Sequence, residues 1–310
     1  MATYTNPRIA YGEALVELGK ADERVVVLDA DLCKSTMSVL FQDAIPNRYF
    51  EMGIAEANMM STAAGLAVSG KIAFASSFAV FATGRAYDQI RQTISIGKLN
   101  VKICGSSCGL SDYGDGSTHQ AIEDVAIMSA IPNMTVLAPL DSTEVRLAVR
   151  AAAAIQGPVY MRVNRNPVLD LLDKDATFEL GKFRILRPGS DVLLLAHGVM
   201  VEKSLLAAEL LEKAGVSAKV VSVATLKPFN YQGVVELAHG MKGVVTAEEH
   251  SYIGGLAAAT ALALRRSSVP MDFVALNDTF GESALKTEDL QTAYGLTAEN
   301  IAAKARTLIK

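Results

Sequence analysis

Short apolar segments alternate with helical patterns along the whole chain, and this alternation most limits the possible folds. Residues 25–28, 72–76 and 159–163 are largely apolar, and each is short enough for a strand that is buried on both faces. The segments between such runs, for example 8–20 and 142–155, carry apolar residues at helical spacing. Strands separated by helices predict a parallel sheet with helices on both faces. We therefore expect an α/β protein.

This pattern is interrupted once, by a polar and charged stretch near the middle of the chain. A length of 310 residues suggests two domains of ordinary size. We expect a first domain at residues 1–168, a linker at 169–182 and a smaller second domain at 183–310. In each domain, the order of strands and helices predicts a mostly parallel sheet with helices on both faces.

Composition and charge exclude several classes of partner. The net charge is −4 and the chain has no basic run, so we expect no nucleic acid, whose phosphates require clustered Lys and Arg. No apolar run reaches the ~18 uncharged residues of a membrane span, so we expect no membrane partner. Cys33, Cys104 and Cys108 are too loosely spaced for a disulfide framework or a zinc site. A reducing, cytoplasmic location is the simplest expectation.

One carboxylate, Glu56, interrupts a segment of apolar and small residues. A helix over residues 54–68 would be apolar nearly all round and therefore buried. Glu56 could cap this helix or be ion-paired in the core, and both are structural roles. It could also be a functional carboxylate in a low-dielectric site, where burial raises its proton affinity. This segment alone favours a structural role.

Three further groups of residues allow either a structural or a functional interpretation. His119 ends a long loop rich in Gly, Ser and Asp, beside Asp115, and could exchange protons or bind a substrate hydroxyl. Phe78 and Phe81 could pack in the core or form a wall for a flat ring. Arg165 follows a strand and could be a surface charge or clamp a phosphate. Taken singly, each group has a simple structural explanation.

Several familiar catalytic motifs are missing from the sequence. There is no Walker motif, nucleophile elbow or HExxH zinc signature. The tripeptide GDG at 114–116 is similar to the start of the motif that binds Mg²⁺ and the diphosphate in thiamine-diphosphate enzymes, but Asn133 comes too early to complete it. We therefore expect no metal ligands in this chain.

Taken together, the motifs of this chain resemble those of transketolase. In the first half they are ADL at 30–32, EMGIAEANM at 51–59 and GDGSTHQ at 114–120; in the second half they are RPG at 187–189, LKP at 226–228 and EEH at 248–250. The resemblance covers essentially all 310 residues, as a pyrimidine-binding domain followed by a transketolase C-terminal domain. The transketolase N-terminal domain, which binds the diphosphate and metal, has no counterpart in these residues. The chain therefore resembles the C-terminal subunit of a split transketolase.

The resemblance also implies roles for individual residues. Glu56 matches the glutamate that hydrogen-bonds N1′ of the cofactor's aminopyrimidine, and His119 is the second catalytic candidate. The residues implied in cofactor binding are Asp31, Leu32, Ile54, Glu56, Phe78, Phe81 and Arg85. Those implied in binding the sugar phosphate are Asp115, His119, Arg165 and, with weaker matches, Ser35 and Arg8.

The activity implied by the resemblance is transfer of a two-carbon ketol unit from a ketose phosphate to an aldose phosphate. It implies thiamine diphosphate as cofactor, Mg²⁺ held mainly by the partner, and an N-terminal transketolase subunit as that partner. A dimer of heterodimers is the implied assembly. Two alternatives stay open: the beta-type subunit of another thiamine-diphosphate enzyme, namely a 2-oxo-acid dehydrogenase or a deoxyxylulose-phosphate synthase, and a non-catalytic subunit.

Overall fold

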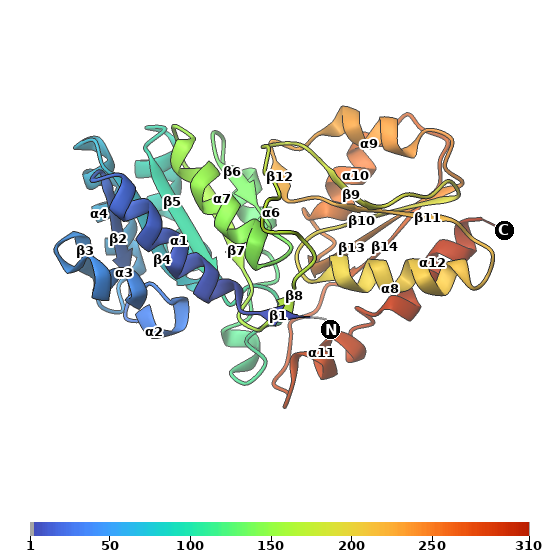
Figure 1. Ribbon diagram of the computed structural model, residues 1–310, viewed down its shortest axis with the longest axis horizontal. Coiled ribbons are helices and arrows are strands. Elements are labelled where there is room, and N and C mark those ends of the chain that lie inside the picture. Colours follow the sequence, from blue (N-terminus) through green and yellow to red (C-terminus); the bar gives the residue numbers. More distant parts are fainter. Residues whose placement is uncertain (1–2, 310) are drawn as a thin grey trace.

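Two sheets, one in each half of the chain, organise the protein and lie side by side (Figure 1). The computed structural model describes residues 3–309. Each half is an α/β unit with a mostly parallel sheet, which confirms the predicted fold class. Within residues 3–309, no helix is both long enough and apolar enough to cross a membrane.

The first sheet has seven strands in the order β12-β6-β7-β5-β4-β2-β3. Six of them are parallel and come from the first half: β2 (Val25–Asp29), β3 (Tyr49–Glu51), β4 (Ile72–Phe78), β5 (Val101–Ser106), β6 (Thr135–Leu137) and β7 (Val159–Val163). The seventh, β12 (Thr225–Lys227), comes from the second half and pairs with β6 in the antiparallel direction. The second half therefore completes the sheet of the first.

Helices cover both faces of the first sheet, because alternate strand residues point to opposite sides. The longer helices are α1 (Pro7–Ala21), α4 (Glu56–Val68), α6 (Asp124–Ala130) and α7 (Ser142–Ala154); the short ones are α2 (Cys33–Thr36), α3 (Val39–Ala44) and α5 (Tyr87–Gln89). Val25 and Val27 of β2 pack in one cluster with α1 and α7. Val26 and Leu28 pack in another with α4 and α6. Full burial of such a side chain contributes about 1.5–3 kcal/mol.

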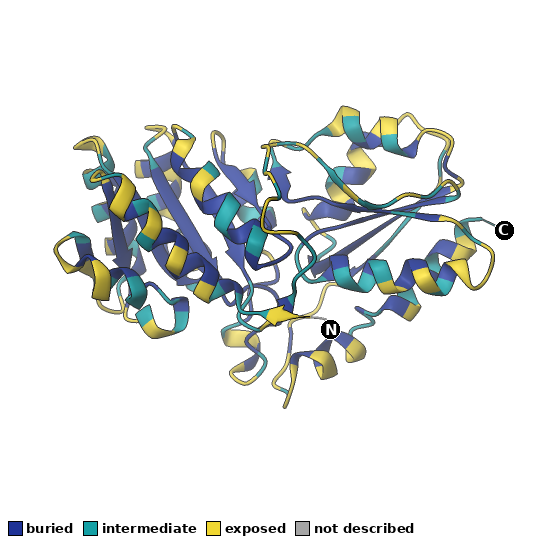
Figure 2. Cartoon of the chain, viewed as in Figure 1, coloured by how far each residue is buried: buried dark blue, intermediate teal, exposed yellow. Residues whose placement is uncertain are grey.

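The second sheet has five strands in the order β14-β13-β10-β11-β9. They are β9 (Arg184–Arg187), β10 (Val192–Ala196), β11 (Ala218–Ser222), β13 (Gly243–Ser251) and β14 (Met271–Leu276), and only β9 is antiparallel to its neighbour. The helices of this half are α8 (Met200–Glu212), α9 (Tyr231–Ala238), α10 (Leu256–Ala263), α11 (Thr287–Ala293) and α12 (Ala298–Leu308). α8 and α12 pack on one face, and α9 and α10 on the other. Figure 2 shows that the strands of both sheets are largely buried.

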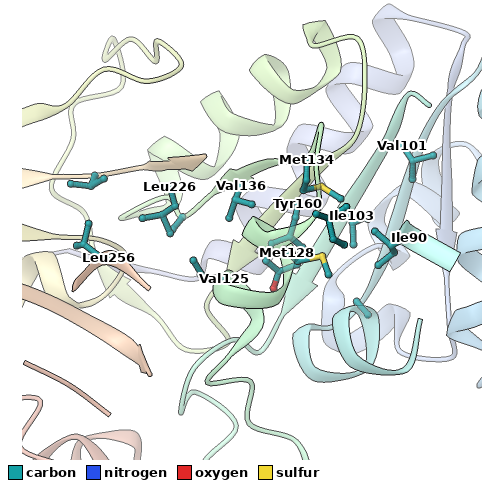
Figure 3. Packing of buried hydrophobic residues seen from close by; sticks show 14 of the residues in the cluster. Ile90, Val101, Ile103, Val125, Met128, Met134, Val136, Tyr160, Leu226 and Leu256 are labelled. Carbon is teal, nitrogen blue, oxygen red and sulfur yellow. The ribbon is translucent and has the colours of Figure 1, made fainter. Parts of the chain in front are cut away.

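One apolar core continues from the first half into the second. Figure 3 follows it from Ile90 and Ile103 through Met128 to Leu226 and Leu256. A second connection between the halves is the antiparallel pairing of β12 with β6. Within the first half, β1 (Tyr4–Thr5) pairs with β8 (Val168–Leu169) and ties the start of the chain to the end of that half. The two halves are therefore fixed to one another by shared core and shared backbone pairing.

One expected helix is less buried than predicted, and one helical segment is irregular. The helix expected at 54–68 begins at Glu56 and is buried on one face only, since Ile54 before it is 75% exposed and its last residue, Val68, is 73% exposed. Hydropathy alone could not reveal this exposed face, which is polar at Asn58 and Ser61. Residues 78–92 do not form one regular helix, because β4 extends to Phe78 and π-helical turns flank α5 on both sides.

Candidate active site

The candidate residues follow the carboxyl ends of five parallel strands. Asp31 and Leu32 follow β2, Ile54 and Glu56 follow β3, Phe78 ends β4, Asp115 and His119 lie in the loop after β5, and Arg165 follows β7. In open α/β sheets the carboxyl ends of the strands form the usual binding edge. The start of α1 brings Arg8 to the same edge, where its Nη1 donates to the backbone oxygen of Ser35 at 2.8 Å. The hydroxyl of Ser35 plays no part in that contact.

Glu56 is the first residue of α4, and its carboxylate is only 1% exposed. Arg85 Nη1 donates to both carboxylate oxygens, at 2.9 Å to Oε2 and 3.1 Å to Oε1. The Arg85 side chain is itself 52% exposed, and its guanidinium carbon lies 4.8 Å from the centre of the Phe81 ring. The surroundings are therefore not purely apolar as the sequence suggested. A single cation, open to solvent, neutralises the buried carboxylate.

Three rings form an aromatic wall beside this ion pair, in which two rings are nearly parallel and the third stands at a steep angle to both. Phe78 and Phe81 have ring centres 6.0 Å apart and planes inclined by 15°. The half-buried His119 presents its ring edge to Phe81 at 5.2 Å and to Phe78 at 6.3 Å between ring centres. Its Nδ1 lies 2.9 Å from the hydroxyl of Thr118. The π-helical turn Phe81–Arg85 places both Phe81 and Arg85 in this wall.

A second ion pair lies close to Phe78. Arg165 Nη1 donates to Asp112 Oδ2 at 2.8 Å, and its guanidinium carbon lies 5.6 Å from the centre of the Phe78 ring. Asp112 is buried, and burial raises its pKa although Arg165 opposes the shift. The pKa of Arg8 is lowered by burial and by repulsion from Arg165. Arg8 and Arg165 therefore place two positive charges close together. The one buried carboxylate beside them, Asp112, offsets only part of that charge.

Two family models together match most of the chain. Residues 5–168 match the transketolase pyrimidine-binding domain, and residues 181–301 match the transketolase C-terminal domain. The chain belongs to the transketolase family. This result confirms the resemblance inferred from the motifs.

Curated relatives agree with this assignment. A putative transketolase C-terminal section from Methanocaldococcus jannaschii is 44% identical over 303 residues, covering 96% of this chain and 95% of that protein. A 6-deoxy-6-sulfo-D-fructose transketolase subunit from Clostridium sp. (strain MSTE9) is 43% identical over 295 residues, covering 95% of this chain and 91% of that protein. Human transketolase is 34% identical over 307 residues, but this chain spans only 49% of its length.

Solved structures add two further comparisons. A split gene transketolase, described as an inactive beta4 tetramer, has a TM-score of 0.91 and 47% identity, covering all of this chain and 98% of that one. A transketolase from Leishmania mexicana has a TM-score of 0.83 at 24% identity and covers 99% of this chain but 46% of that one, so it shows the same fold. The chain is thus a split transketolase-family subunit.

Transketolases generally use thiamine diphosphate and a divalent metal, so the residues present can be tested for their fit to each. A buried carboxylate next to a wall of three rings suits a flat heteroaromatic ring with a basic nitrogen. A metal is a different matter, because residues 3–309 contain no group of three or more His, Cys, Asp or Glu side chains arranged to hold one. The split transketolase chain therefore fits the pyrimidine half of the cofactor.

The loop after β2 has its own support. Asp31 adopts a positive φ of 61°, and its backbone N–H donates to Glu51 Oε1 at 2.8 Å. The N–H of Leu32 donates to Asp29 Oδ1 at 2.7 Å. Asp29 is buried, and burial raises its pKa to about 6 although the hydrogen bonds it accepts oppose the shift. These two carboxylates hold the loop in place beside the exposed Ile54.

Sequence reasoning missed Asp29, Glu51 and Asp112. Glu51 begins one of the motifs that carry the resemblance and Asp29 directly precedes another, so a search for loop-capping carboxylates could have found them. Asp112 pairs with a residue 53 positions away, and nothing in the local pattern indicates that partner. Arg162, which is close in sequence to Arg165, points elsewhere and is buried in an ion pair with Asp124.

Proposed function

We propose that this chain is the C-terminal subunit of a two-chain, thiamine-diphosphate-dependent transketolase that transfers a two-carbon ketol unit between sugar phosphates. The observation that carries this proposal is the buried Glu56, which lies against an aromatic wall at an open edge of the sheet. When bound, thiamine diphosphate supplies the electron sink for breaking a carbon–carbon bond next to a carbonyl. The chain's own residues bind and orient the cofactor and the sugar, and they exchange protons with them.

Glu56 is the proposed proton-sharing group for N1′ of the aminopyrimidine. Both of its oxygens accept from Arg85 in this structure, so a ring nitrogen must share the carboxylate with Arg85 or take its place. Arg85 can leave without being stranded, because half of its side chain already faces solvent. Phe78 and Phe81 are proposed to contact the ring, and Asp31, Leu32 and Ile54 to line the neighbouring side of the cofactor.

The sugar is proposed to lie along the loop after β5. Asp115 is exposed and His119 is half-buried beside the aromatic wall, so both are available to hydroxyl groups. Arg165 and Arg8 are proposed to hold the anionic end of the sugar, near Ser35. A relative that is 43% identical is a subunit acting on a 6-deoxy-6-sulfo sugar, so the anionic group can be a phosphate or a sulfonate. Both groups present three oxygens to a guanidinium.

The missing half of the site is proposed to come from an N-terminal transketolase subunit. The alignment with human transketolase covers 97% of this chain and 49% of that enzyme, and a solved relative that is 47% identical is described as a split gene transketolase. The partner would hold Mg²⁺ and the diphosphate, in a dimer of heterodimers. Under this proposal the chain alone is inactive.

A reconstitution assay tests the proposal. The chain is mixed with its N-terminal partner, thiamine diphosphate and Mg²⁺, and ketol transfer is measured with a ketose phosphate and with 6-deoxy-6-sulfo-D-fructose as donors. We expect transfer only from the mixture. Substantial activity from this chain alone would contradict the two-chain proposal, and a mixture that transfers no ketol unit from either donor would contradict the activity. The donor with the higher kcat/KM identifies the anionic group.

A further inference from the structure

The second half of the chain grips the loop that carries Asp112, Asp115 and His119. We propose that the second domain is a positioning device for this substrate loop, and that Glu249 and Gln291 are its positioning residues. This inference rests on the proposed function for its catalytic readout, but its structural readout is independent of that function.

Glu249 reaches across from β13 to the start of the loop. Its Oε2 accepts from the backbone N–H of Leu110 at 3.1 Å, and its Oε1 accepts from Gln291 Nε2 at 2.8 Å. All three residues are buried, and Gln291 lies on α11 of the second half. One carboxylate therefore links a strand and a helix of the second domain to the loop of the first. A buried carboxylate with both oxygens occupied has little freedom to move.

Two more hydrogen bonds fasten the middle of the loop to the segment between β14 and α11. Gln120 Nε2 donates to the backbone oxygens of Glu282, at 3.0 Å, and of Asp112, at 3.2 Å. The backbone N–H of Ala284 donates to the oxygen of Tyr113 at 2.8 Å. The loop is therefore held at two places by a segment more than 160 residues away in sequence.

Asn166 fastens the same loop from a third side. Its Nδ2 donates to the oxygen of Ser111 at 3.0 Å and to the hydroxyl of Thr287, the first residue of α11, at 2.7 Å. Asn166 directly follows Arg165, so the arm that carries the proposed anion-binding guanidinium is tied to the same helix as the loop. The two parts of the proposed sugar site thus share one support.

Glycines allow this close approach. Gly109 has a positive φ of 60°, and a Cβ at this position would lie 2.2 Å from Glu249 Oε2. Gly116 has a positive φ of 76°, and a Cβ there would lie 2.5 Å from the hydroxyl of Ser283. Only glycine combines this backbone conformation with the available space. The loop backbone is therefore packed directly on the second domain at two separate points.

The burial pattern fits a held base and a free tip. Residues 108–112 of the loop are buried, whereas Asp115 and its neighbours Gly114 and Ser117 are exposed. Fixing the backbone of one residue costs about 1–2 kcal/mol of conformational entropy. If the loop is already ordered, this cost is not subtracted from the free energy of substrate binding. Substrate affinity therefore depends on Glu249 and Gln291, which contact the loop and not the substrate.

The decisive experiment exchanges the partners of one hydrogen bond. In Gln291→Glu, two carboxylates face each other in a buried place and the grip on Leu110 is weakened. Adding Glu249→Gln restores a donor–acceptor pair with its direction reversed, because the new amide can donate to the introduced carboxylate and still accept from Leu110. Gln291→Leu removes the donor without adding charge and guards against a folding defect. Gln232→Leu, an exposed site on α9, is the matched control.

Two readouts are measured on the reconstituted complex and the free chain. We expect Gln291→Glu to raise the KM for the ketose donor by about tenfold while kcat falls less than threefold, with most of the affinity regained in the double variant. Amide exchange of residues 108–116 should speed up by at least tenfold in Gln291→Glu and Gln291→Leu, in the free chain too, and stay unchanged in Gln232→Leu.

Unchanged exchange and unchanged KM in both Gln291 variants would overturn the positioning role. A tenfold faster exchange with no effect on KM would also overturn it, because the contact would then be merely structural. If the wild-type complex transfers no ketol unit at all, the proposed function fails; the exchange experiment then still decides whether the second domain orders this loop.

Discussion

The protein contains two ion pairs of the same chemistry in different surroundings. Arg85–Glu56 and Arg162–Asp124 each join a guanidinium to a carboxylate that is at most 1% exposed, at 2.9 Å and 2.7 Å. They differ in the cation, since the side chain of Arg162 is 5% exposed and that of Arg85 is 52% exposed. The first pair opens to solvent at the edge of a sheet, and the second is enclosed between two domains.

The partners of each pair extend this contrast. Tyr160 donates its hydroxyl to Asp124 at 2.6 Å, and Arg162 also donates to the backbone oxygens of Ala121 and Glu249, at 3.3 and 3.2 Å. Burial alone would raise the pKa of Asp124, but Arg162, His250 and Tyr160 together hold it below its ordinary value. Arg85 has the Glu56 carboxylate and the face of one ring.

The exposure of the cation decides whether a ligand can displace it from its carboxylate. A cation that already faces water can give up its place to a ligand that satisfies the buried carboxylate, because water solvates the released cation. A cation enclosed on all sides cannot leave, because its removal strands a buried charge. The enclosed pair is therefore suited to joining domains, and the open pair to a site where something else must reach the carboxylate.

The largest expected effect is on catalysis, in Glu56→Gln. Turnover of the reconstituted complex should fall by roughly 10²–10⁴-fold, which is the usual range for the loss of an acid–base group. The free energy of unfolding should change by less than about 1 kcal/mol, because the released Arg85 can turn into solvent. Steady-state kinetics and urea unfolding of the same preparation test both statements. A variant with normal turnover would show that Glu56 has no part in the mechanism and that the open ion pair has no catalytic role.

The enclosed pair should show the opposite profile in Asp124→Asn. Here the free energy of unfolding should fall by about 3–5 kcal/mol, since Arg162 is left buried without its counter-charge. The matched control is Asp22→Asn, which breaks a 2.7 Å pair with Arg24 on the surface and should cost less than about 1 kcal/mol. Chemical denaturation measures both variants. Equal losses in the two would show that enclosure does not distinguish these pairs.

Arg165–Asp112 is intermediate, because the carboxylate is buried and the cation is 31% exposed. Arg165→Met should raise the KM for a donor with an anionic end by about 10–100-fold, the usual worth of a charged hydrogen bond. The KM for a ketol donor without phosphate or sulfonate should change far less. Comparing kcat/KM for the two donors tests this, and equal losses for both would contradict a role in binding the anionic group.

The smallest expected effect is a dependence of stability on pH that originates in the enclosed region. His197 and His250 are buried, and burial lowers the pKa of each, although Glu248 opposes the shift. Below about pH 6.5 the unfolded chain takes up protons that the folded chain refuses, so stability is lost as the pH falls. The slope should be at most about 1.4 kcal/mol per pH unit for each histidine.

Thermal unfolding between pH 8 and pH 5 measures this slope. His197→Gln should flatten it, and the exposed His239 supplies the control substitution His239→Gln. If the two variants lose stability with falling pH as steeply as the wild type, the buried histidine does not drive the effect.

The alternation of apolar runs and helices was enough to predict the parallel sheet of the first half, because β2, β4 and β7 are each recognisable from their own residues. The short strands β1, β8, β9 and β12 could not be predicted in the same way, since each is defined by a partner rather than by its own composition. The order of elements was therefore readable, while the pairing between the two halves was not.

The same limit applies to the candidate site. The motifs indicated Glu56 and His119, the family resemblance added Phe78 and Phe81, and the structure brings all four to the carboxyl edge of the first sheet. Their catalytic roles stay predictions. The ion pair between Glu56 and Arg85 joins residues 29 positions apart, and Arg85 lies in an irregular turn. A local sequence pattern therefore could not predict this pair. Burial and loop support depend on contacts that only the folded chain creates.

The strand β12 has a consequence for how this protein is made. The outer edge of β6 stays unpaired until residues 225–227 have left the ribosome, more than 85 residues after β6 itself. During that interval the nascent first domain exposes the unpaired edge of a strand that is buried in the finished protein. Such an edge is a template for wrong pairing with other chains. Truncating the gene after the first domain would leave this edge permanently unpaired. We therefore expect the truncated chain to aggregate more readily than the full chain.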